Sequence, residues 1–140
     1  MILDNSLLLA DGQGQTTAVA STNVIDTLAT GNAYVGDFFV VRIDTAFTAG
    51  AGAPTATFQL QTSASGTFTA DGITLIQSGA LLAAALTANS FALRARIPLG
   101  VKRYLRGYFS PSASSDSTRF SAGAWDMFIT ADTRFLINSV

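Results

Sequence analysis

The chain has 140 residues, of which 12% are charged and 49% hydrophobic, and its formal net charge is −1 at pH 7. This length is most simply one domain over residues 1–140, and the near-neutral charge excludes a long-range attraction for nucleic acid or anionic membranes. Cys and His are absent, which excludes disulfides, thiolate nucleophiles, Ser-His-Asp arrangements and Cys-based metal sites.

The composition favours an all-β protein. All nine acidic residues are Asp, which prefers turns and helix caps, whereas Glu, the better helix former, is absent. Thr, Val, Ile and Phe, which suit pleated surfaces, are frequent. We therefore expect an antiparallel β-sandwich or jelly roll of seven or eight short strands, with extended arms at the termini.

Residues 1–21 mix an apolar patch, Leu7–Leu9, with a polar run that contains Gly. This segment is compatible with a first strand or with an arm that orders on a partner, and 1–16 and 131–140 are the candidate arms. No basic stretch precedes the apolar patch. The segment therefore does not resemble a secretory signal.

Alternating apolar residues predict four strands before residue 80. They are expected at 23–28, 37–47, 56–62 and 73–76. In the third, Phe58 and Leu60 face inward and Gln59 and Gln61 outward. The second is the central one, because four apolar side chains share one of its faces: Phe39, Val41, Ile43 and Phe47. The Ala-rich run 80–86 is ambiguous and compatible with one or two helical turns. It is far shorter than the ~20 residues that span a bilayer.

The stretch FALRARIPLGVKRYLRGYF, from Phe91 to Phe109, carries five of the chain's eight basic residues. Its Pro-Leu-Gly sequence suits a turn, so we predict two neighbouring strands in a hairpin with its connection at 98–102. The alternation within each strand also holds if the two strands lie in different sheets. In the hairpin register the core-facing residues are Phe91, Leu93, Ile97, Leu105 and Phe109. The outer face then gathers Arg and Tyr side chains.

We predict that this Arg/Tyr face binds a partner protein. The candidate binding residues are Arg94, Arg96, Arg103, Tyr104, Arg106 and Tyr108. Arg and Tyr are enriched at interface hot spots, and Arg pairs bidentately with carboxylates. One alternative is an ordinary solvated strand face. Another is a nucleic-acid surface on which Tyr104 and Tyr108 stack bases, but no second aromatic strand accompanies them.

A last strand is expected at 119–130. Its two faces carry Trp125, Met127 and Ile129 on one side and Phe120 and Phe128 on the other. Apolar residues on both faces indicate either a central strand or an exposed patch. If Trp125 and Tyr34 were exposed, they would suit the aromatic platform of a carbohydrate- or receptor-binding module, which is the alternative function.

Catalytic chemistry is hard to build from these residue types. Without His, Cys and Glu, the usual general acids and bases reduce to Asp, Lys and Tyr. Asp126 and Asp132 are the obvious carboxylate pair for glycosidase-type chemistry, although turn or surface positions explain both more simply. The Asp residues also lack EF-hand spacing. We expect no enzyme activity, no metal and no cofactor.

Four segments of the chain together resemble one known family. They are MILDNSLLLADGQ, STNVIDTL, VVRIDTAFTAGAGAPTATFQLQTS and RIPLGVKRYLRGYF. In this order they are similar to the jelly-roll capsid cement proteins, or decoration proteins, of tailed bacteriophages. The similarity runs over nearly the whole chain to about Asp132, and the segment from Ile97 to Tyr108 is its most specific part.

The resemblance implies a small β protein that binds the outside of a capsid and bridges neighbouring subunits of the major capsid protein. It also implies self-association, as a dimer or trimer, without enzyme activity or a cofactor. We accordingly expect a structural virion protein that is made in the host cytoplasm and located on the capsid exterior. Contacts with nucleic acid or membrane are not expected.

Overall fold

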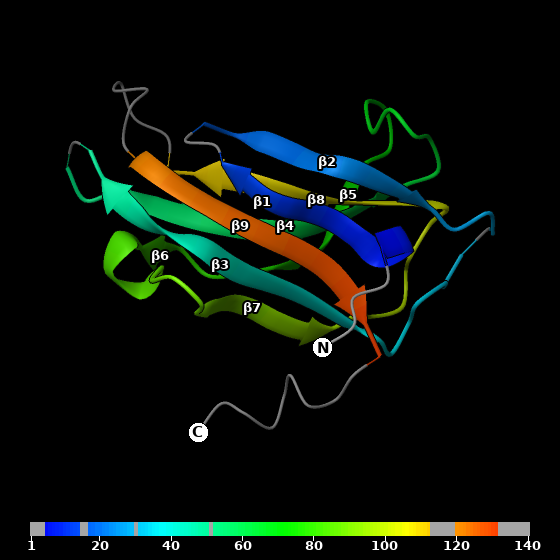
Figure 1. The fold of residues 1–140 in the computed structure, drawn as a ribbon. Helices are drawn as coiled ribbons and strands as arrows, with labels where there is room; N and C mark the ends of the chain where they lie inside the picture. Colours follow the sequence, from blue (N-terminus) through cyan, green and yellow to red (C-terminus); the bar gives the residue numbers. More distant parts are fainter. Residues whose placement is uncertain (1–4, 15–16, 30, 51, 113–119, 132–140) are drawn as a thin grey trace.

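The computed structural model of the protein describes residues 5–14, 17–29, 31–50, 52–112 and 120–131. These residues form two antiparallel sheets that pack against each other, as Figure 1 shows. The strands are β1 (Leu8–Gly14), β2 (Val19–Asp26), β3 (Phe38–Ala49), β4 (Thr55–Ser63), β5 (Ile73–Gln77), β6 (Leu81–Leu82), β7 (Phe91–Arg96), β8 (Tyr104–Pro111) and β9 (Phe120–Thr130). Two short 3₁₀ turns, η1 (Asn5–Leu7) and η2 (Ala83–Ala85), precede β1 and follow β6.

The strand order is that of a jelly roll. The four-stranded sheet has the order β1-β9-β3-β7, and the five-stranded sheet has the order β2-β8-β4-β5, with β6 paired to β4. The first four strands alternate between the sheets, as do the last three, so most connections cross the sandwich. The predicted fold class is confirmed. The short β6 brings the described strands to nine, one more than the expected upper number.

A cluster of aromatic rings joins the two sheets. Phe47 of β3 and Phe120 and Trp125 of β9 meet Phe58 of β4 and Phe109 of β8 in the main core. The ring centroids are 4.5 Å apart for Phe109 and Trp125, and 5.1 Å apart for Phe47 and Phe120. Aromatic pairs of this kind add about 0.5–1.5 kcal/mol each beyond the area they bury. The rings therefore hold the sheets together.

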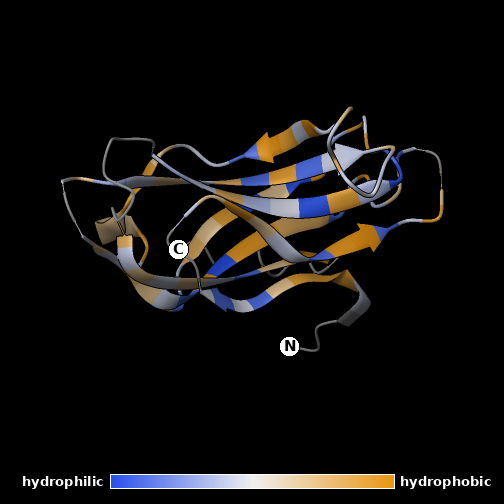
Figure 2. Ribbon diagram, turned by 90° about the horizontal axis from the view of Figure 1, so that it is seen from above, coloured by the Kyte–Doolittle hydropathy of each residue, from blue (hydrophilic) through white to orange (hydrophobic). Residues whose placement is uncertain are grey.

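Most of the predicted inward-facing residues lie in this core. The confirmed positions include Phe39, Val41, Ile43, Phe47, Phe58, Leu60, Met127 and Ile129. Along the strands hydrophobic and hydrophilic residues alternate, which is visible in Figure 2. Phe120 corrects the prediction, because it joins Trp125 in the core instead of facing away from it. The pairing of β9 with β3 shifts register next to Phe120, which interrupts the alternation.

The sequence allowed two interpretations of residues 1–21 and of residues 80–86, and the structure describes parts of both segments. Residues 8–14, within the candidate N-terminal arm, form β1 and pair with β9 at the edge of the four-stranded sheet. The Ala-rich run 80–86 forms the short β6 followed by the 3₁₀ turn η2. Of the candidate C-terminal arm, 132–140 lies outside the described residues.

Candidate interaction surfaces

The predicted Arg/Tyr face is divided between the two sheets. β7 pairs with β3, whereas β8 pairs with β2 and β4. The predicted hairpin is therefore wrong. Arg94 and Arg96 lie on the outer face of the four-stranded sheet, and Tyr104, Arg106 and Tyr108 lie on the outer face of the five-stranded sheet. One flat partner surface cannot contact both groups, because they lie on opposite sides of the sandwich.

The connection from 97 to 103 crosses from one sheet to the other. Ile97 and Val101 are both buried in the main core. The backbone N–H of Ile97 donates to the carbonyl of Asp37 (2.8 Å), and the N–H of Asn32 donates to the carbonyl of Val101 (2.7 Å). These bonds tie the connection to the loop between β2 and β3. The alternation within each strand is the same for a hairpin and for a crossover, so the sequence pattern does not distinguish them.

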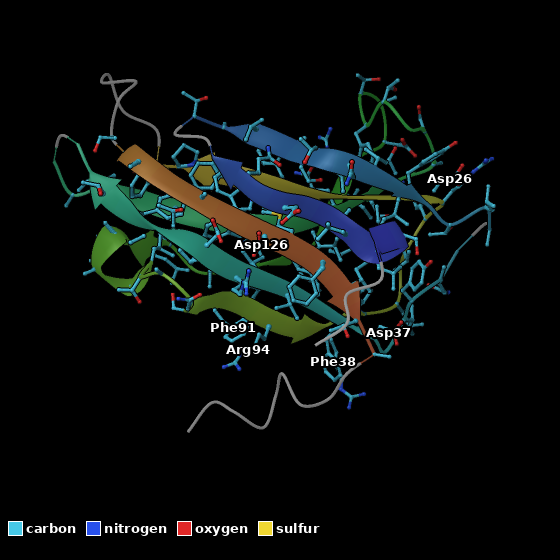
Figure 3. All side chains as sticks on the ribbon, in the orientation of Figure 1. Asp26, Asp37, Phe38, Phe91, Arg94 and Asp126 are labelled. Atoms are coloured by element: carbon cyan, nitrogen blue, oxygen red, sulfur yellow. The ribbon has the colours of Figure 1, made fainter. Side chains whose placement is uncertain are left out.

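The outer face of the four-stranded sheet, which we call the Phe38 face, is apolar with a cationic edge. Phe38, Val40 and Phe128 form a small cluster on it, each with 2% exposure or less. The guanidinium of Arg96 lies 4.9 Å from the centre of the Phe38 ring. Arg94 extends from β7 on the same face, as Figure 3 shows. The Phe38 face thus has a buried apolar centre with arginines beside it.

Phe91 lies on the Phe38 face and not in the predicted core. Its side chain is 37% exposed. The pairing of β3 with β7 shifts register between Val41 and Arg42, which places Phe91 opposite Arg42 on the outward side. The guanidinium of Arg94 then lies 4.7 Å from the Phe91 ring centre.

Asp126, one of the two carboxylates considered for catalysis, has a structural environment. It is 3% exposed, and it accepts hydrogen bonds from the backbone N–H of Gly12 (2.6 Å) and from Nε of Arg42 (2.8 Å). These contacts join β1, β9 and β3 across the Phe38 face, where Figure 3 labels Asp126. Asp132 lies outside the described residues. Asp126 therefore links three neighbouring strands of the sheet.

The outer face of the five-stranded sheet, which we call the Arg106 face, centres on one guanidinium. Its residues are Val24, Gln59, Gln61, Phe68, Tyr104, Arg106 and Tyr108. Nε of Arg106 donates to the side-chain oxygen of Gln61 (2.9 Å). The guanidinium carbon lies 4.3 Å from the Phe68 ring centre and 5.6 Å from that of Tyr108. Burial lowers the pKa of Arg106, and Tyr108 opposes that shift.

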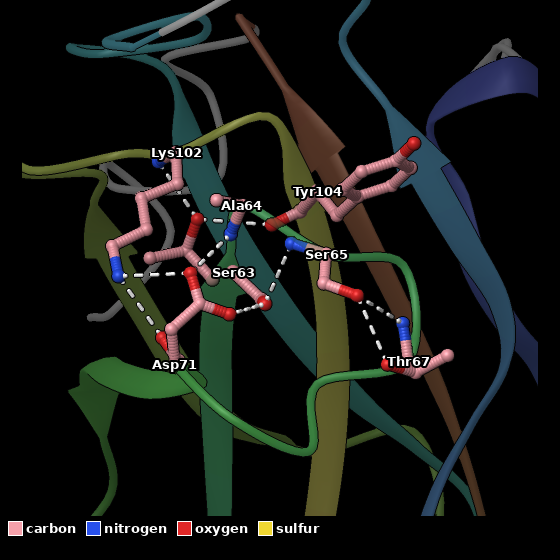
Figure 4. Close-up of polar contacts among 8 residues, drawn as sticks. Ser63, Ala64, Ser65, Thr67, Asp71, Lys102 and Tyr104 are labelled. Carbon is pink, nitrogen blue, oxygen red and sulfur yellow. Dashed lines mark hydrogen bonds and ion pairs between the residues drawn. The ribbon is translucent and has the colours of Figure 1, made fainter.

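Asp71 closes the loop between β4 and β5 that carries Phe68 (Figure 4). Its carboxylate accepts hydrogen bonds from the Ser63 hydroxyl, from the backbone N–H of Ala64 (2.8 Å) and from Nζ of Lys102 (3.3 Å). These bonds, that of Ser63 first, lower the pKa of Asp71 to about 2. Phe68 holds a left-handed backbone with φ of 56° and is 7% exposed. The closed loop therefore presents the Phe68 ring to Arg106.

Arg103 is already neutralised within the chain. Its Nε and Nη2 donate to the two carboxylate oxygens of Asp26 at 2.8 and 2.9 Å. This bidentate pair lowers the pKa of Asp26 and raises that of Arg103. The Arg103 guanidinium thus has a carboxylate partner within the protein.

The aromatic platform of a carbohydrate-binding module is not formed by the two residues proposed for it. Trp125 is fully buried in the main core, because β9 is a central strand between β1 and β3. Tyr34 is half-buried and packs against the same core. The two side chains therefore do not form an exposed pair.

No cluster of metal ligands is found in the part of the chain that the structure describes. There, no three His, Cys, Asp or Glu side chains come together as metal ligands. A helix long and apolar enough to cross a membrane is likewise not found among those residues. The candidate functional features are the two outer sheet faces.

The sequence matches the family model described as Bbp16 over residues 9–129. The chain belongs to the Bbp16 family. The Bbp16 match begins in β1 and ends in β9, so it includes both sheets and both outer faces. No curated protein matches the chain. The name Bbp16 states no activity, so the functional argument depends on the residues themselves.

The sequence prediction missed two partners of Arg106, which are Gln61 and Phe68. Gln61 was expected to point outward from its strand, but the pairing of β4 with β8 that places it beside Arg106 was not predicted. Phe68 is a lone aromatic residue in a polar loop. The hint in the sequence was this lone aromatic residue next to the Asp71-Gly72 turn signal.

Proposed function

We propose that this member of the Bbp16 family is a structural virion protein that binds the outer capsid surface and cements neighbouring subunits of the major capsid protein. The resemblance of four segments to phage capsid cement proteins supports this function. Those segments contribute to strands of both sheets, from β1 to β8. The jelly roll is also the fold that the resemblance implies.

The observation that carries the proposal is the chemistry of the two outer faces. On each face an arginine lies over an aromatic ring, Arg96 over Phe38 and Arg106 over Phe68. An aromatic ring restrains a guanidinium while leaving its edge able to pair with a carboxylate. Arginine and aromatic residues are enriched at protein interfaces. Both faces therefore suit contact with a protein.

Two opposite faces also suit the task of a cement. One face can bind the shell while the other face or an edge contacts a second copy, as a dimer or trimer. Each copy adds a modest interface energy, and many copies must be displaced together before the shell opens. The shell is thereby stabilised without any chemical reaction.

This function places the protein on the capsid exterior after its synthesis in the host cytoplasm. It requires no cofactor, no nucleic acid and no membrane. The engagement of Asp126 with Arg42 and the Gly12 backbone supports a structural role for the carboxylate that was considered for catalysis.

Sedimentation with capsids tests the proposal. Purified protein is mixed either with assembled capsids that lack it or with free coat subunits, and the pellet is analysed. We expect binding to assembled capsids only, and weaker binding as salt is added if arginines contribute. Absence of capsid binding would contradict the proposal. Binding on a glycan array without capsid binding would favour the alternative, a carbohydrate- or receptor-binding module of a virion.

A further inference from the structure

The guanidinium of Arg106 is held in place before any partner arrives. Gln61 accepts a hydrogen bond from its Nε (2.9 Å), and the ring centres of Phe68 and Tyr108 lie 4.3 and 5.6 Å from its central carbon. A side chain that is already restrained loses less conformational entropy when it binds. Arg106 is therefore prepared for a contact and is unlike a freely moving surface arginine.

The loop between β4 and β5 is built to supply one of these rings. Asp71, near the end of the loop, accepts hydrogen bonds from Ser63 and Ala64 at its start and from Lys102. These bonds join the two ends of the loop. Phe68 adopts the left-handed backbone, which costs a non-Gly residue free energy and persists only where surrounding contacts impose it. A rigid loop that places an aromatic ring under a guanidinium is more than a solvated strand face requires.

The hydrogen bond of Arg106 to Gln61 uses Nε and not the terminal Nη groups. Among the described residues, none accepts a hydrogen bond from Nη1 or Nη2 of Arg106. Its neighbours on adjacent strands, Val24 and Gln61, are uncharged. The carboxylate of Asp26, farther along β2, is occupied by Arg103. Within the described part of the chain, no carboxylate therefore pairs with the positive charge at the centre of the Arg106 face.

We propose that the Arg106 face is the side of the protein that contacts the capsid, and that Arg106 binds a carboxylate there, the side chain of an Asp or Glu of the major capsid protein. The two Nη groups match the two oxygens of a carboxylate, and such bidentate pairs are strong and directional. Tyr104, Tyr108 and Val24 surround the contact with apolar surface that excludes water. This inference rests on the proposed function and adds to it the face, the residue and the chemistry of the partner.

Capsid sedimentation of four proteins tests this inference: the wild type, Arg106→Gln, Arg106→Lys and Arg96→Gln. Arg96 is the matched comparison, because it also lies over a phenylalanine ring but on the opposite side of the sandwich. We expect Arg106→Gln to weaken binding to assembled capsids by about tenfold to thirtyfold. Arg106→Lys should recover little, since Lys lacks the bidentate fork. Arg96→Gln should bind within about threefold of the wild type.

The variant Phe68→Leu tests whether the position of the Arg106 guanidinium matters in addition to its charge. Phe68→Leu keeps the positive charge but removes the ring under it, so we expect an intermediate loss of capsid binding. Thermal unfolding of each variant shows whether it is folded at the temperature of the assay. Because the contact is ionic, the difference between the wild type and Arg106→Gln should shrink as salt is raised.

The outcomes distinguish the two proposals. If the wild type does not bind capsids, the proposed function fails. If the wild type binds and folded Arg106→Gln binds equally well, the proposed function stands and this inference is overturned. A greater loss in Arg96→Gln than in Arg106→Gln would assign the capsid contact to the Phe38 face. If Arg106→Gln instead converts an oligomer of the free protein to a monomer and retains capsid binding, the face binds a second copy and the inference is likewise overturned.

Discussion

Gly107 lies in the middle of β8 at a point where the two sheets approach closely. A Cβ added there would lie 2.2 Å from Sδ of Met127 and 3.4 Å from Cβ of Ser21. Non-bonded heavy atoms prefer separations of about 3.5–4.0 Å, so the Met127 sulfur would have to move by more than about 1 Å. Met127 is fully buried, and its close-packed neighbours oppose such a shift.

We therefore expect Gly107→Ala to lower the free energy of unfolding by about 1–2 kcal/mol. Overpacking costs about 1–3 kcal/mol, and replacing Gly within a strand offsets about 0.5–1 kcal/mol of that loss. Met127→Ala alone should cost about 2–5 kcal/mol, because it leaves a cavity. In the double variant the new methyl group occupies part of that cavity. Its loss should be smaller than the sum of the single losses by about 1–2 kcal/mol.

Equilibrium unfolding in urea, followed by the fluorescence of the single tryptophan, Trp125, measures these values. Gly79→Ala is the matched control, since a Cβ at that position meets no atom within 4 Å. We expect it to change the free energy of unfolding by less than about 0.5 kcal/mol. If Gly107→Ala were as stable as the wild type, or if the two losses simply added, the close approach of the sheets at this position would be refuted.

Three further predictions concern the polar contacts and the backbone. Asp126→Ala should lower the free energy of unfolding in urea by about 2–3 kcal/mol, because the N–H of Gly12 loses its acceptor and Arg42 loses its buried partner. The exposed Asp44→Ala is the control, and equal stability of the two variants would contradict the role of Asp126. The pKa of Asp71 is lowered to about 2 from 3.8, so its carboxylate stabilises the fold above about pH 4 and the contribution is lost as the pH falls to about 2. Asp71→Asn should therefore flatten the acid-side fall of Tm, and parallel melting curves for variant and wild type would argue against it. Leu28 holds φ of 58° and is 81% exposed, so Leu28→Gly should raise the free energy of unfolding by about 0.5–1 kcal/mol; no gain would indicate that contacts hold Leu28 in place.

The strands themselves could largely be predicted from the sequence. In β4, Phe58 and Leu60 alternate with Gln59 and Gln61, and the period of two in a pleated strand leaves one interpretation. Pairing between strands could not be predicted in the same way. The stretch from 91 to 109 has the same alternation whether β7 and β8 form a hairpin or cross between sheets. The crossing depends on contacts of Ile97 and Val101 with a loop that is distant in the sequence.

The candidate site was predicted in part. The sequence identified Arg106 as a partner-binding candidate, but it grouped this residue with Arg94 and Arg96, which lie on the opposite face. The position of Phe68 beneath Arg106 depends on a left-handed backbone and on the closure of its loop by Asp71. Neither feature has a local sequence pattern. The pairing of Arg103 with Asp26 is likewise decided by a tertiary contact.

A cryo-electron-microscopy map of particles of the virus that encodes this chain tests the proposed function most directly. We expect jelly-roll density on the outside of the shell, at junctions between subunits of the major capsid protein, with the Arg106 face turned toward an acidic side chain. A shell without external density for this chain would contradict its function as a capsid cement.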